Sequence, residues 1–409
     1  MRVAVVGTGI AGLGAAYALS RVHEVELFER EGRAGGHTHT ISHETDGRTL
    51  ALDTGFIVHN ERSYPQLIRL FGELGVRTQD SEMSFSVSCA RCGLEYSGRR
   101  PFAQPRNLAS PSFARLLRDI LRFLRQDPSG VDADLTLERY VANLGYTRGF
   151  RDHFLVPLTA AIWSTAPGGA LDFPAAYALR FFQNHGMLGL RRFRWKTVTG
   201  GSDTYVQAIV SRFRDRLHLE TEVRRVRRDA DGVTLETSQG DALRFDKVVV
   251  ATHPDQALGL LADPSEDERR ILGAFSYSRN ETVLHTDERF LPRRRAARAS
   301  WNYQLADCRA PSARPTMTYY LNRLQRLDEA EHYCVTLNRG AEIREDRVIA
   351  RMLYEHPLYT FESLRAQEEL PRLNGQRHTA YCGAYHGFGF HEDGLASGLR
   401  AAEAFGASW

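Results

Sequence analysis

A glycine-rich turn between an apolar strand and an alanine-rich helix, within residues 3–29, constrains this chain more than any other feature. Residues 3–6 are an apolar run, residues 7–12 carry the spacing GxGxxG, and a second apolar run at 25–28 ends in Glu29. This succession of strand, turn, helix, strand and acid is typical of a β-α-β unit that binds a dinucleotide. We therefore expect an α/β domain built around a parallel sheet.

Each residue of the turn has a physical role in such a unit. Gly7 permits the tight turn, Gly9 leaves room for a pyrophosphate, and Gly12 lets helix and strand pack closely. The phosphates would meet the free N–H groups and the positive end of the helix. Glu29 lies 22 positions after Gly7, where an acid binds ribose hydroxyls and argues against NADP. A glycine-rich turn in another kind of α/β protein is the alternative, and the agreement of all five elements argues against it.

The residues after the second strand favour FAD over NAD. Arg33 is followed by the glycine pair Gly35 and Gly36. This extension resembles that of flavoproteins in the amine oxidase, phytoene desaturase and protoporphyrinogen oxidase superfamily, in which the extra glycines let the backbone touch the FAD pyrophosphate. His37 stands where many members have arginine.

The segment 381–402 resembles the second FAD motif of the same superfamily. A short strand ends at Gly383, and Gly394 and Ser397 open an alanine-rich helix that the resemblance points toward the flavin ring and ribityl chain. Many relatives have an acid directly after the first glycine. Ala384 takes that place here, so the contact is missing or comes from Glu392 or Asp393.

Two middle segments fit the same plan. Residues 217–226 and 232–236 predict the two strands of a hairpin, with Leu217, Leu219, Thr221 and Val223 on one face. The resemblance implies a backbone contact between Val223 and the adenine. Residues 247–252 predict a buried strand, which resembles the strand that closes the FAD domain in this superfamily.

The resemblance implies FAD contacts over the whole set of motifs, including the turn at 53–55. These residues are Gly7, Gly9, Ile10, Ala11, Gly12, Glu29, Arg30, Arg33, Gly35, Gly36, His37, Thr54, Gly55, Phe56, Val223, Ala251, Gly383, Asp393, Gly394, Leu395 and Ser397. No residue matches a covalent attachment point, so we expect non-covalent FAD.

Four further segments narrow the resemblance. Residues 52–65, 160–165, 180–186 and 387–394 look similar to a bacterial subgroup of predicted NAD/FAD-binding oxidoreductases. Members of that subgroup are often associated with fatty-acid-modifying methyltransferases of the cyclopropane-synthase type. The resemblance implies a lipid acyl substrate.

These motifs predict a fold class of α/β type, with a Rossmann-type FAD-binding domain interleaved with an α+β substrate domain, as in amine oxidases. We expect the FAD-binding domain to comprise residues 1–75, 200–260 and 365–409. We expect the substrate domain to comprise residues 76–199 and 261–364. The length of 409 residues suits two joined domains better than one core.

Composition excludes several classes of function. A net charge of +3 is too small to favour nucleic-acid binding. No apolar stretch is long enough to span a membrane, and the first apolar run is needed for the fingerprint, so we reject a signal peptide. We therefore expect a cytoplasmic protein, with peripheral contact to the inner membrane left open.

The five cysteines do not form a disulfide framework. Cys89 and Cys92 make one CxxC pair without a second pair nearby, and Gly93 and Gly98 lie just beyond it. We interpret the pair as the tip of a hairpin in preference to a zinc site or a redox motif. No metal site is predicted.

Residues 112–125 predict a basic amphipathic helix. Its apolar face carries Phe113, Leu116, Leu117, Ile120, Leu121 and Leu124 at helical spacing, and its arginines lie elsewhere. Packing of this face on the core is the first interpretation. The second is a helix on a membrane surface, which would suit a substrate held in a bilayer.

The chemistry expected is hydride transfer from a substrate C–H bond to FAD, followed by reoxidation by O2 or an unknown acceptor. His391, Glu392 and Tyr385 in the second FAD motif, and His59 beyond the turn at 53–55, are the candidates for catalysis. A structural role stays open for each. Residues predicted to line the substrate cavity are Trp163, Asn184, His185, Trp301 and Tyr320.

Three functions remain in competition. The first is a desaturase or dehydrogenase acting on a lipid acyl chain. The second is a flavin amine oxidase, although residues 261–364 lack the lysine that many such enzymes place near the flavin. The third is a flavin-binding protein without catalysis.

Overall fold

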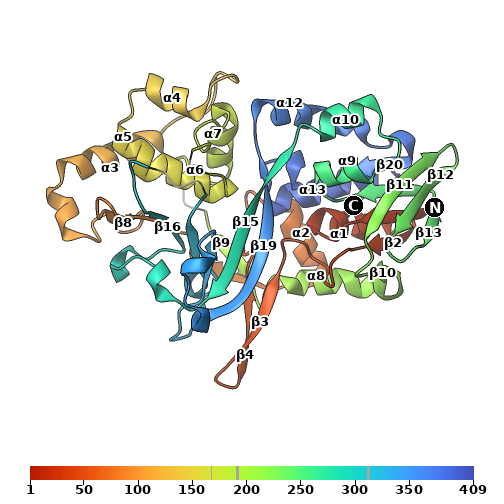
Figure 1. Cartoon of the computed structure of the whole chain (residues 1–409), viewed down its shortest axis with the longest axis horizontal. Coiled ribbons are helices and arrows are strands. Elements are labelled where there is room, and N and C mark those ends of the chain that lie inside the picture. The colour runs from red at the N-terminus through yellow and green to blue at the C-terminus, as the bar shows by residue number, and fades with distance from the viewer. Residues whose placement is uncertain (167, 190–192, 311–313) are drawn as a thin grey trace.

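A computed structural model describes residues 1–166, 168–189, 193–310 and 314–409 of the chain (Figure 1). The parallel sheet that the glycine-rich turn predicts is present, with the strand order β10-β2-β1-β14-β20 and parallel pairing throughout. Its strands are β10 (Leu217–His218), β2 (Glu24–Phe28), β1 (Arg2–Val6), β14 (Lys247–Val250) and β20 (Thr379–Tyr381). The two chain termini lie at this end of the molecule.

Side chains of β1 alternate between two cores, as the period of two in a strand requires. Val3 and Val5 face a layer of four helices, whereas Ala4 and Val6 face the opposite layer. The first layer contains α1 (Ile10–Leu19), α2 (Pro65–Leu74), α8 (Asp203–Val210) and α13 (His391–Glu403). The second contains α9 (Pro254–Leu260), α10 (Glu266–Leu272), α12 (Phe361–Glu369) and the sheet of β11 (Val223–Asp229), β12 (Gly232–Thr237) and β13 (Ala242–Phe245).

The helices of the two glycine motifs pack directly on each other. A side chain on Gly398 of α13 would overlap the backbone of Ala11 in α1, and one on Gly394 would meet Ile10. Gly12 meets the backbone of Gly7 in the same way. These glycines allow α1 and α13 to pack closely. The starts of both helices, although far apart in sequence, therefore lie next to each other.

The predicted strand at 217–226 is wrong in one respect, because two strands occupy it. β10 pairs with β2 in the parallel sheet, and β11 begins at Val223 and pairs with β12 in the predicted hairpin. Glu220 has φ +50, which breaks the extended run between them. The alternation of apolar residues continues across this break, so the pattern alone gives no sign of it.

A second sheet, of seven strands, has the order β19-β15-β18-β17-β16-β7-β8. Its strands are β19 (Val348–Leu358), β15 (Ser276–His285), β18 (Cys334–Leu337), β17 (Met317–Tyr320), β16 (Trp301–Leu305), β7 (Phe85–Cys89) and β8 (Glu95–Ser97). β15 and β19, the two longest strands, pair over ten residues between the parallel sheet and the rest of this sheet. The expected division into five segments remains a prediction.

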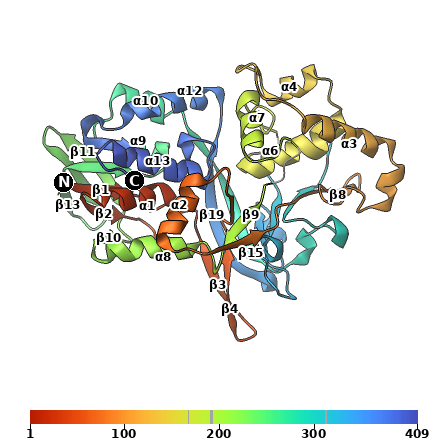
Figure 2. The same cartoon turned by 180° about the vertical axis from the view of Figure 1, so that it is seen from behind.

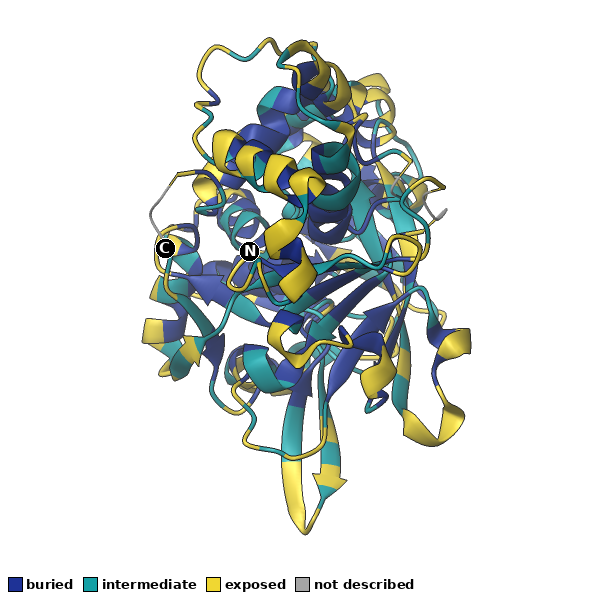
Figure 3. Ribbon diagram, turned by 90° about the vertical axis from the view of Figure 1, so that its left-hand side faces the viewer, coloured by how far each residue is buried: buried dark blue, intermediate teal, exposed yellow. Residues whose placement is uncertain are grey.

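Helices cover one face of the seven-stranded sheet, at the end of the molecule far from the termini (Figure 2). They are α3 (Pro111–Phe123), α4 (Leu137–Asn143), α5 (Arg148–Phe150), a π-helix at Arg151–Leu155, α6 (Val156–Trp163) and α7 (Ala175–Asn184). The other face packs against α11 (Leu321–Leu324) and β4 (Arg48–Asp53). β4 pairs with β3 (Thr40–Thr45) in a hairpin that projects from the body with an exposed tip (Figure 3).

A small antiparallel sheet of β5 (Val58–Asn60), β9 (Trp195–Val198) and β6 (Thr78–Ser81) connects the two halves. The expected hairpin around Cys89 and Cys92 is confirmed, because β7 and β8 pair antiparallel across this turn. Among the described residues, no helix has both the length and the apolar character needed to cross a bilayer.

The apolar face predicted for residues 112–125 packs on the protein. Phe113 and Leu116 are buried, and Leu117 and Ile120 pack against the same core. Two residues of the predicted face lie outside this core: Leu121, with 51% of its surface exposed, and the half-buried Leu124. The first of the two interpretations of this helix is therefore the one that the packing supports.

Candidate active site

A cavity of about 950 Å3 lies between the parallel sheet and the seven-stranded sheet. One wall comes from the turns that follow β1, β2 and β14, at the carboxyl ends of parallel strands, where ligands of such sheets bind. The opposite wall comes from β19, β16, β17 and the helices α6 and α7. The cavity is thus built by both halves of the molecule.

The first wall is made largely of backbone. A side chain on Gly36 would lie 3.0 Å from the Cα of Gly9, so the two glycine segments lie directly against each other. A Cβ on Gly9 would itself have open space around it. Glu29 lines the cavity beside them and accepts hydrogen bonds from the amide (3.0 Å) and the hydroxyl (2.6 Å) of Thr8.

Most of the residues predicted to contact the cofactor line this cavity. They are Gly7, Gly9, Ile10, Ala11, Glu29, Arg30, Arg33, Gly36, His37, Gly55, Phe56, Val223, Ala251 and Gly383. Their convergence from six separate segments is what the two motifs require of a single binding site.

The other predicted contacts lie behind the described lining and support it. They are Gly12, Gly35, Thr54, Asp393, Gly394, Leu395 and Ser397. The Ser397 hydroxyl, for example, accepts a hydrogen bond from the Gly383 amide (2.9 Å) and holds the end of β20 against α13. The Thr54 hydroxyl donates to the backbone of His39 (2.9 Å).

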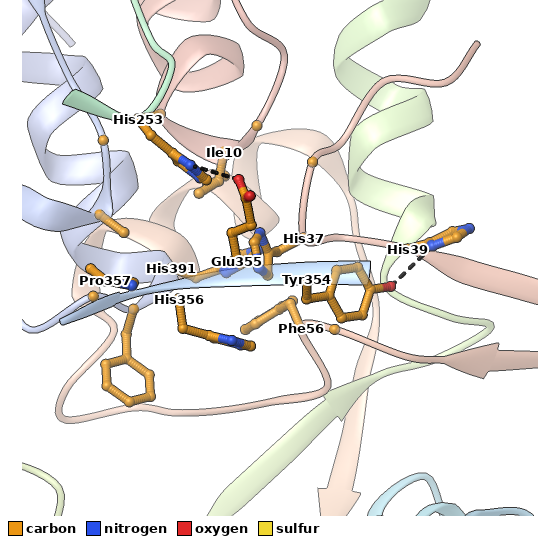
Figure 4. Close-up of a pocket in the computed structure, with 18 of the residues that line it drawn as sticks. Ile10, His37, His39, Phe56, His253, Tyr354, Glu355, His356, Pro357 and His391 are labelled. Atoms are coloured by element: carbon orange, nitrogen blue, oxygen red, sulfur yellow. Dashed lines mark hydrogen bonds and ion pairs between the residues drawn. The ribbon is translucent and has the colours of Figure 1, made fainter. Parts of the chain in front are cut away.

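His391, the first catalytic candidate, lines the cavity at the start of α13 (Figure 4). Its Nε2 lies 2.8 Å from the Thr38 hydroxyl, which also hydrogen-bonds Tyr205. Its ring stacks on Phe56 with 3.9 Å between ring centres. Burial, with a smaller contribution from His37, lowers the pKa of His391 to about 3. The imidazole is therefore neutral at neutral pH.

Glu392 and Asp393 point away from the described lining. The Glu392 carboxylate accepts hydrogen bonds from the backbone amides of Gln66 (2.9 Å) and Leu67 (3.0 Å), at the start of α2. Asp393 accepts one from the Phe390 amide (3.0 Å), at the start of its own helix. Both acids therefore cap helices, and neither reaches the wall beside Ala384.

Tyr385 and His59, the remaining candidates, differ in position. Tyr385 lines the cavity, and its hydroxyl has no hydrogen-bond partner among the described residues. Burial raises the pKa of this hydroxyl well above its usual value. His59 lies outside the described lining, where its ring packs edge-on against Phe71. Burial lowers the pKa of His59 to about 4.

Sequence reasoning missed a group of residues on β19. Tyr354 and His356 project from the same face of this strand beside His37 (Figure 4). The rings of His37 and His356 are 5.4 Å apart, and Nε2 of His37 has no partner among the described residues. Burial lowers the pKa of His37 to about 4 and that of His356 to about 3. The alternation of Tyr354, His356 and Leu358 along one strand was the available signal, but nothing local connects it to the glycine motifs.

Aromatic and aliphatic side chains form most of the second wall. Of the residues predicted to line it, Trp163, His185 and Trp301 do so, whereas Asn184 and Tyr320 do not. Tyr319 lines the cavity in place of Tyr320 because neighbouring residues of a strand face opposite ways.

The model of the family described as flavin containing amine oxidoreductase matches residues 10–405. The chain belongs to this family. By family it is a FAD-dependent oxidoreductase, and FAD is its cofactor. The backbone wall at Gly9 and Gly36, the acid Glu29 and the unpartnered His37 nitrogen fit a dinucleotide that carries a polar ring system. The expected fold class is thereby confirmed.

Individual members of the family give further comparisons. An L-amino-acid oxidase of Pseudechis australis is 40% identical over 83 residues, which are 20% of this chain and 16% of that enzyme. The match thus spans a small part of this curated relative. A putrescine oxidase with a redesigned cofactor site superposes with a TM-score of 0.72 at 17% identity, over 99% of both chains. A CLA-producing fatty acid isomerase from P. acnes gives a TM-score of 0.67 at 16% identity, over 97% and 96% of the two chains. At such identities these superpositions show a shared fold.

Proposed function

We propose that this flavin oxidoreductase removes hydride from a hydrophobic substrate, in particular one that carries a lipid acyl chain. The observation that supports the proposal is the apolar character of the second wall. Its members include Met83, Ile162, Trp163, Phe181, Met187, Trp301, Tyr319, Met352 and Leu353. Such a wall favours an acyl chain over a charged molecule because burying an unpaired charge there is costly.

The charged groups of the described second wall are already paired. Arg279, whose Nε lies 3.4 Å from the Glu355 carboxylate, compensates its negative charge. His253 lies 3.4 Å from the same carboxylate (Figure 4), but burial lowers the pKa of His253 to about 4, so this ring adds no charge at neutral pH. The two lysines lie elsewhere, with Lys196 ion-paired to Glu61 at 3.0 Å. A protonated amine would therefore meet no free carboxylate among the described residues of this wall.

FAD, when bound, supplies the hydride acceptor, and the protein supplies position, shielding and proton transfer. We assign the glycine segments at 7–12 and 35–36 to the pyrophosphate and Glu29 to the ribose. We assign His37 the holding or transfer of a proton, because this residue lines the cavity, its ring is neutral at neutral pH and its buried Nε2 has no partner among the described residues. His391 would position Phe56 through ring stacking.

An anaerobic absorbance spectrum of the purified protein tests the proposal. Addition of bacterial phospholipids with unsaturated or methylated acyl chains should bleach the oxidised-flavin band, and mass spectrometry should find a new double bond. Met352→Glu, which places a charge in the apolar wall, should slow the bleaching, whereas Met352→Leu should not. A flavin that stays oxidised with every lipid, and in both variants, would contradict the lipid assignment.

Amine oxidation is the second candidate, and the aromatic wall supports it. Trp163, Trp301 and Tyr319 line the cavity, and aromatic rings can hold a cation without a carboxylate. The same spectrum, recorded with hydrophobic amines in place of lipids, distinguishes the two functions. Bleaching by amines and not by lipids would replace the first candidate with the second.

The proposal includes contact with an anionic membrane surface through α3. The exposed side of this helix carries Arg115, Arg118 and Arg122 around the exposed Leu121. Such a basic stripe is attracted to anionic lipids over a short range. Sedimentation with phosphatidylglycerol vesicles should recover the protein at low salt, and Arg115→Glu with Arg122→Glu should abolish this. Equal recovery of the double variant would contradict the contact.

A further inference from the structure

Three cysteines and one histidine meet at the far end of the seven-stranded sheet, outside the cavity. The possible ligand atoms of Cys89, Cys92, His153 and Cys308 all lie within 4.8 Å of one another. They come from three segments that are distant in sequence. Cys89 ends β7 and Cys92 lies in the turn that follows it, His153 lies in the π-helix at Arg151–Leu155, and Cys308 lies just beyond β16.

Hydrogen bonds that do not involve the four side chains also hold these segments together. The amides of Ala90 and Arg91 donate to the carbonyls of Leu305 (2.8 Å) and Ala306 (3.2 Å). The Tyr96 hydroxyl donates to the carbonyl of His153 at 2.7 Å. Gly93 follows the CxxC pair with φ +69, and its amide closes the turn on Cys89 (2.9 Å). The cluster is therefore prearranged by the fold.

We propose that Cys89, Cys92, His153 and Cys308 bind one zinc ion. Zinc prefers a tetrahedron of thiolate and imidazole ligands, with bonds of about 2.3 Å to sulfur and about 2.0 Å to nitrogen. Those bond lengths place two sulfurs about 3.8 Å apart and a sulfur and a nitrogen about 3.5 Å apart. Sγ of Cys92 and Nε2 of His153 are 3.4 Å apart, and the limit of 4.8 Å leaves the remaining pairs a short adjustment away.

Four protein ligands fill the coordination of zinc and leave no open position for substrate or water. The site is therefore structural. It ties the helical layer, through His153, to β7 and β16 of the sheet. That layer carries Trp163 and Phe181 in α6 and α7, so zinc would hold one part of the cavity wall against the other.

A disulfide is the competing fate of the same thiols. It would use two cysteines and leave the third thiol and His153 without a common role. The grouping of all four ligand atoms favours the metal. The two fates differ in the number of free thiols in the denatured, metal-free chain. A zinc site leaves all five cysteines as thiols, whereas one disulfide leaves three.

Metal analysis of the FAD-loaded full chain, purified under reducing conditions without a chelator, tests the proposal. We expect about one zinc per chain, in keeping with a single four-ligand site. Loss of a residue that only hydrogen-bonds a metal ligand weakens metal binding about 10–100-fold. Loss of a ligand itself, in Cys92→Ser or His153→Ala, should therefore weaken zinc binding at least as much. Cobalt in place of zinc should show the strong near-ultraviolet absorption of thiolate ligands.

Two variants serve as controls because they lie far from the cluster. Cys334→Ala removes a buried cysteine of β18, and His43→Ala removes a histidine of the β3–β4 hairpin. Both should keep one zinc per chain, and all four variants should keep FAD, measured by absorbance. The proposal would be overturned if the unsubstituted, FAD-loaded protein had no higher affinity for zinc than the Cys92→Ser variant has. Recovery of Cys89 or Cys92 in a disulfide from reducing buffer would overturn it as well.

Discussion

Replacement of Glu392 by alanine distinguishes a capping role from a catalytic one. The start of α2 has no side-chain cap of its own, and Glu392 supplies two hydrogen bonds there from a different helix. Loss of a helix cap costs about 0.5–2 kcal/mol, and hydrogen bonds to a charged group contribute about 1.5–3 kcal/mol each. Burial, which raises the pKa of Glu392, offsets part of this gain. We expect the free energy of unfolding to fall by about 2 kcal/mol.

Urea unfolding, followed by flavin fluorescence, measures this loss. Glu392→Gln keeps one acceptor oxygen and should cost about half as much. Glu403→Gln, at an exposed position of the same helix, should change the free energy of unfolding by less than about 0.5 kcal/mol. Flavin reduction by substrate, per folded molecule, should change little in all three variants. The reasoning fails if Glu392→Ala keeps its stability while flavin reduction falls a hundredfold.

Three further perturbations have defined outcomes. Gly12→Ala places a Cβ against the Gly7 carbonyl, so FAD content after purification should fall sharply, and a fully yellow variant would contradict the packing. Glu268→Ala leaves the buried Arg228 without its main partner and should cost about 3–5 kcal/mol in urea unfolding, whereas Glu369→Ala, in an exposed pair with Arg270, should cost less than about 1 kcal/mol. Burial raises the pKa of Asp393 to about 7, so the folded protein holds this proton at pH values where the unfolded chain has released it. Stability should therefore fall as pH rises from about 4 to about 7, and a pH series of Asp393→Asn should lack this part of the slope.

The nucleotide side of the site could be predicted because its signals are local. Gly7, Gly9 and Glu29 lie within one β-α-β unit, and their positions follow from the geometry of that unit. The second motif near Gly383 carries a similar local pattern. The first motif therefore predicted most of the residues that meet at the first wall, whereas Gly383 is the one predicted cofactor contact of the second motif that lines the described cavity.

The substrate side could not be predicted in the same way because its contacts depend on long-range strand pairing. Trp301 reaches the cavity because β16 pairs with β7, more than two hundred residues earlier, and His356 because β19 pairs with β15. A shift of one residue separates Tyr319, in the wall, from Tyr320, outside it. The CxxC turn was likewise visible, but its neighbours His153 and Cys308 are 61 and 216 residues from Cys92.

The order of strands in the parallel sheet has a consequence for biosynthesis. β1 is made at the start of the described chain, whereas its neighbour β14 follows at 247–250 and the edge strand β20 at 379–381. The helix α13, which packs on α1, follows later still. On the ribosome, the part of the α1 surface that α13 covers therefore stays exposed through most of translation, although α2 and α8 of the same core are made earlier. Such a nascent chain would benefit from chaperone protection, and its cavity is complete only once Gly383 and His391 have been made.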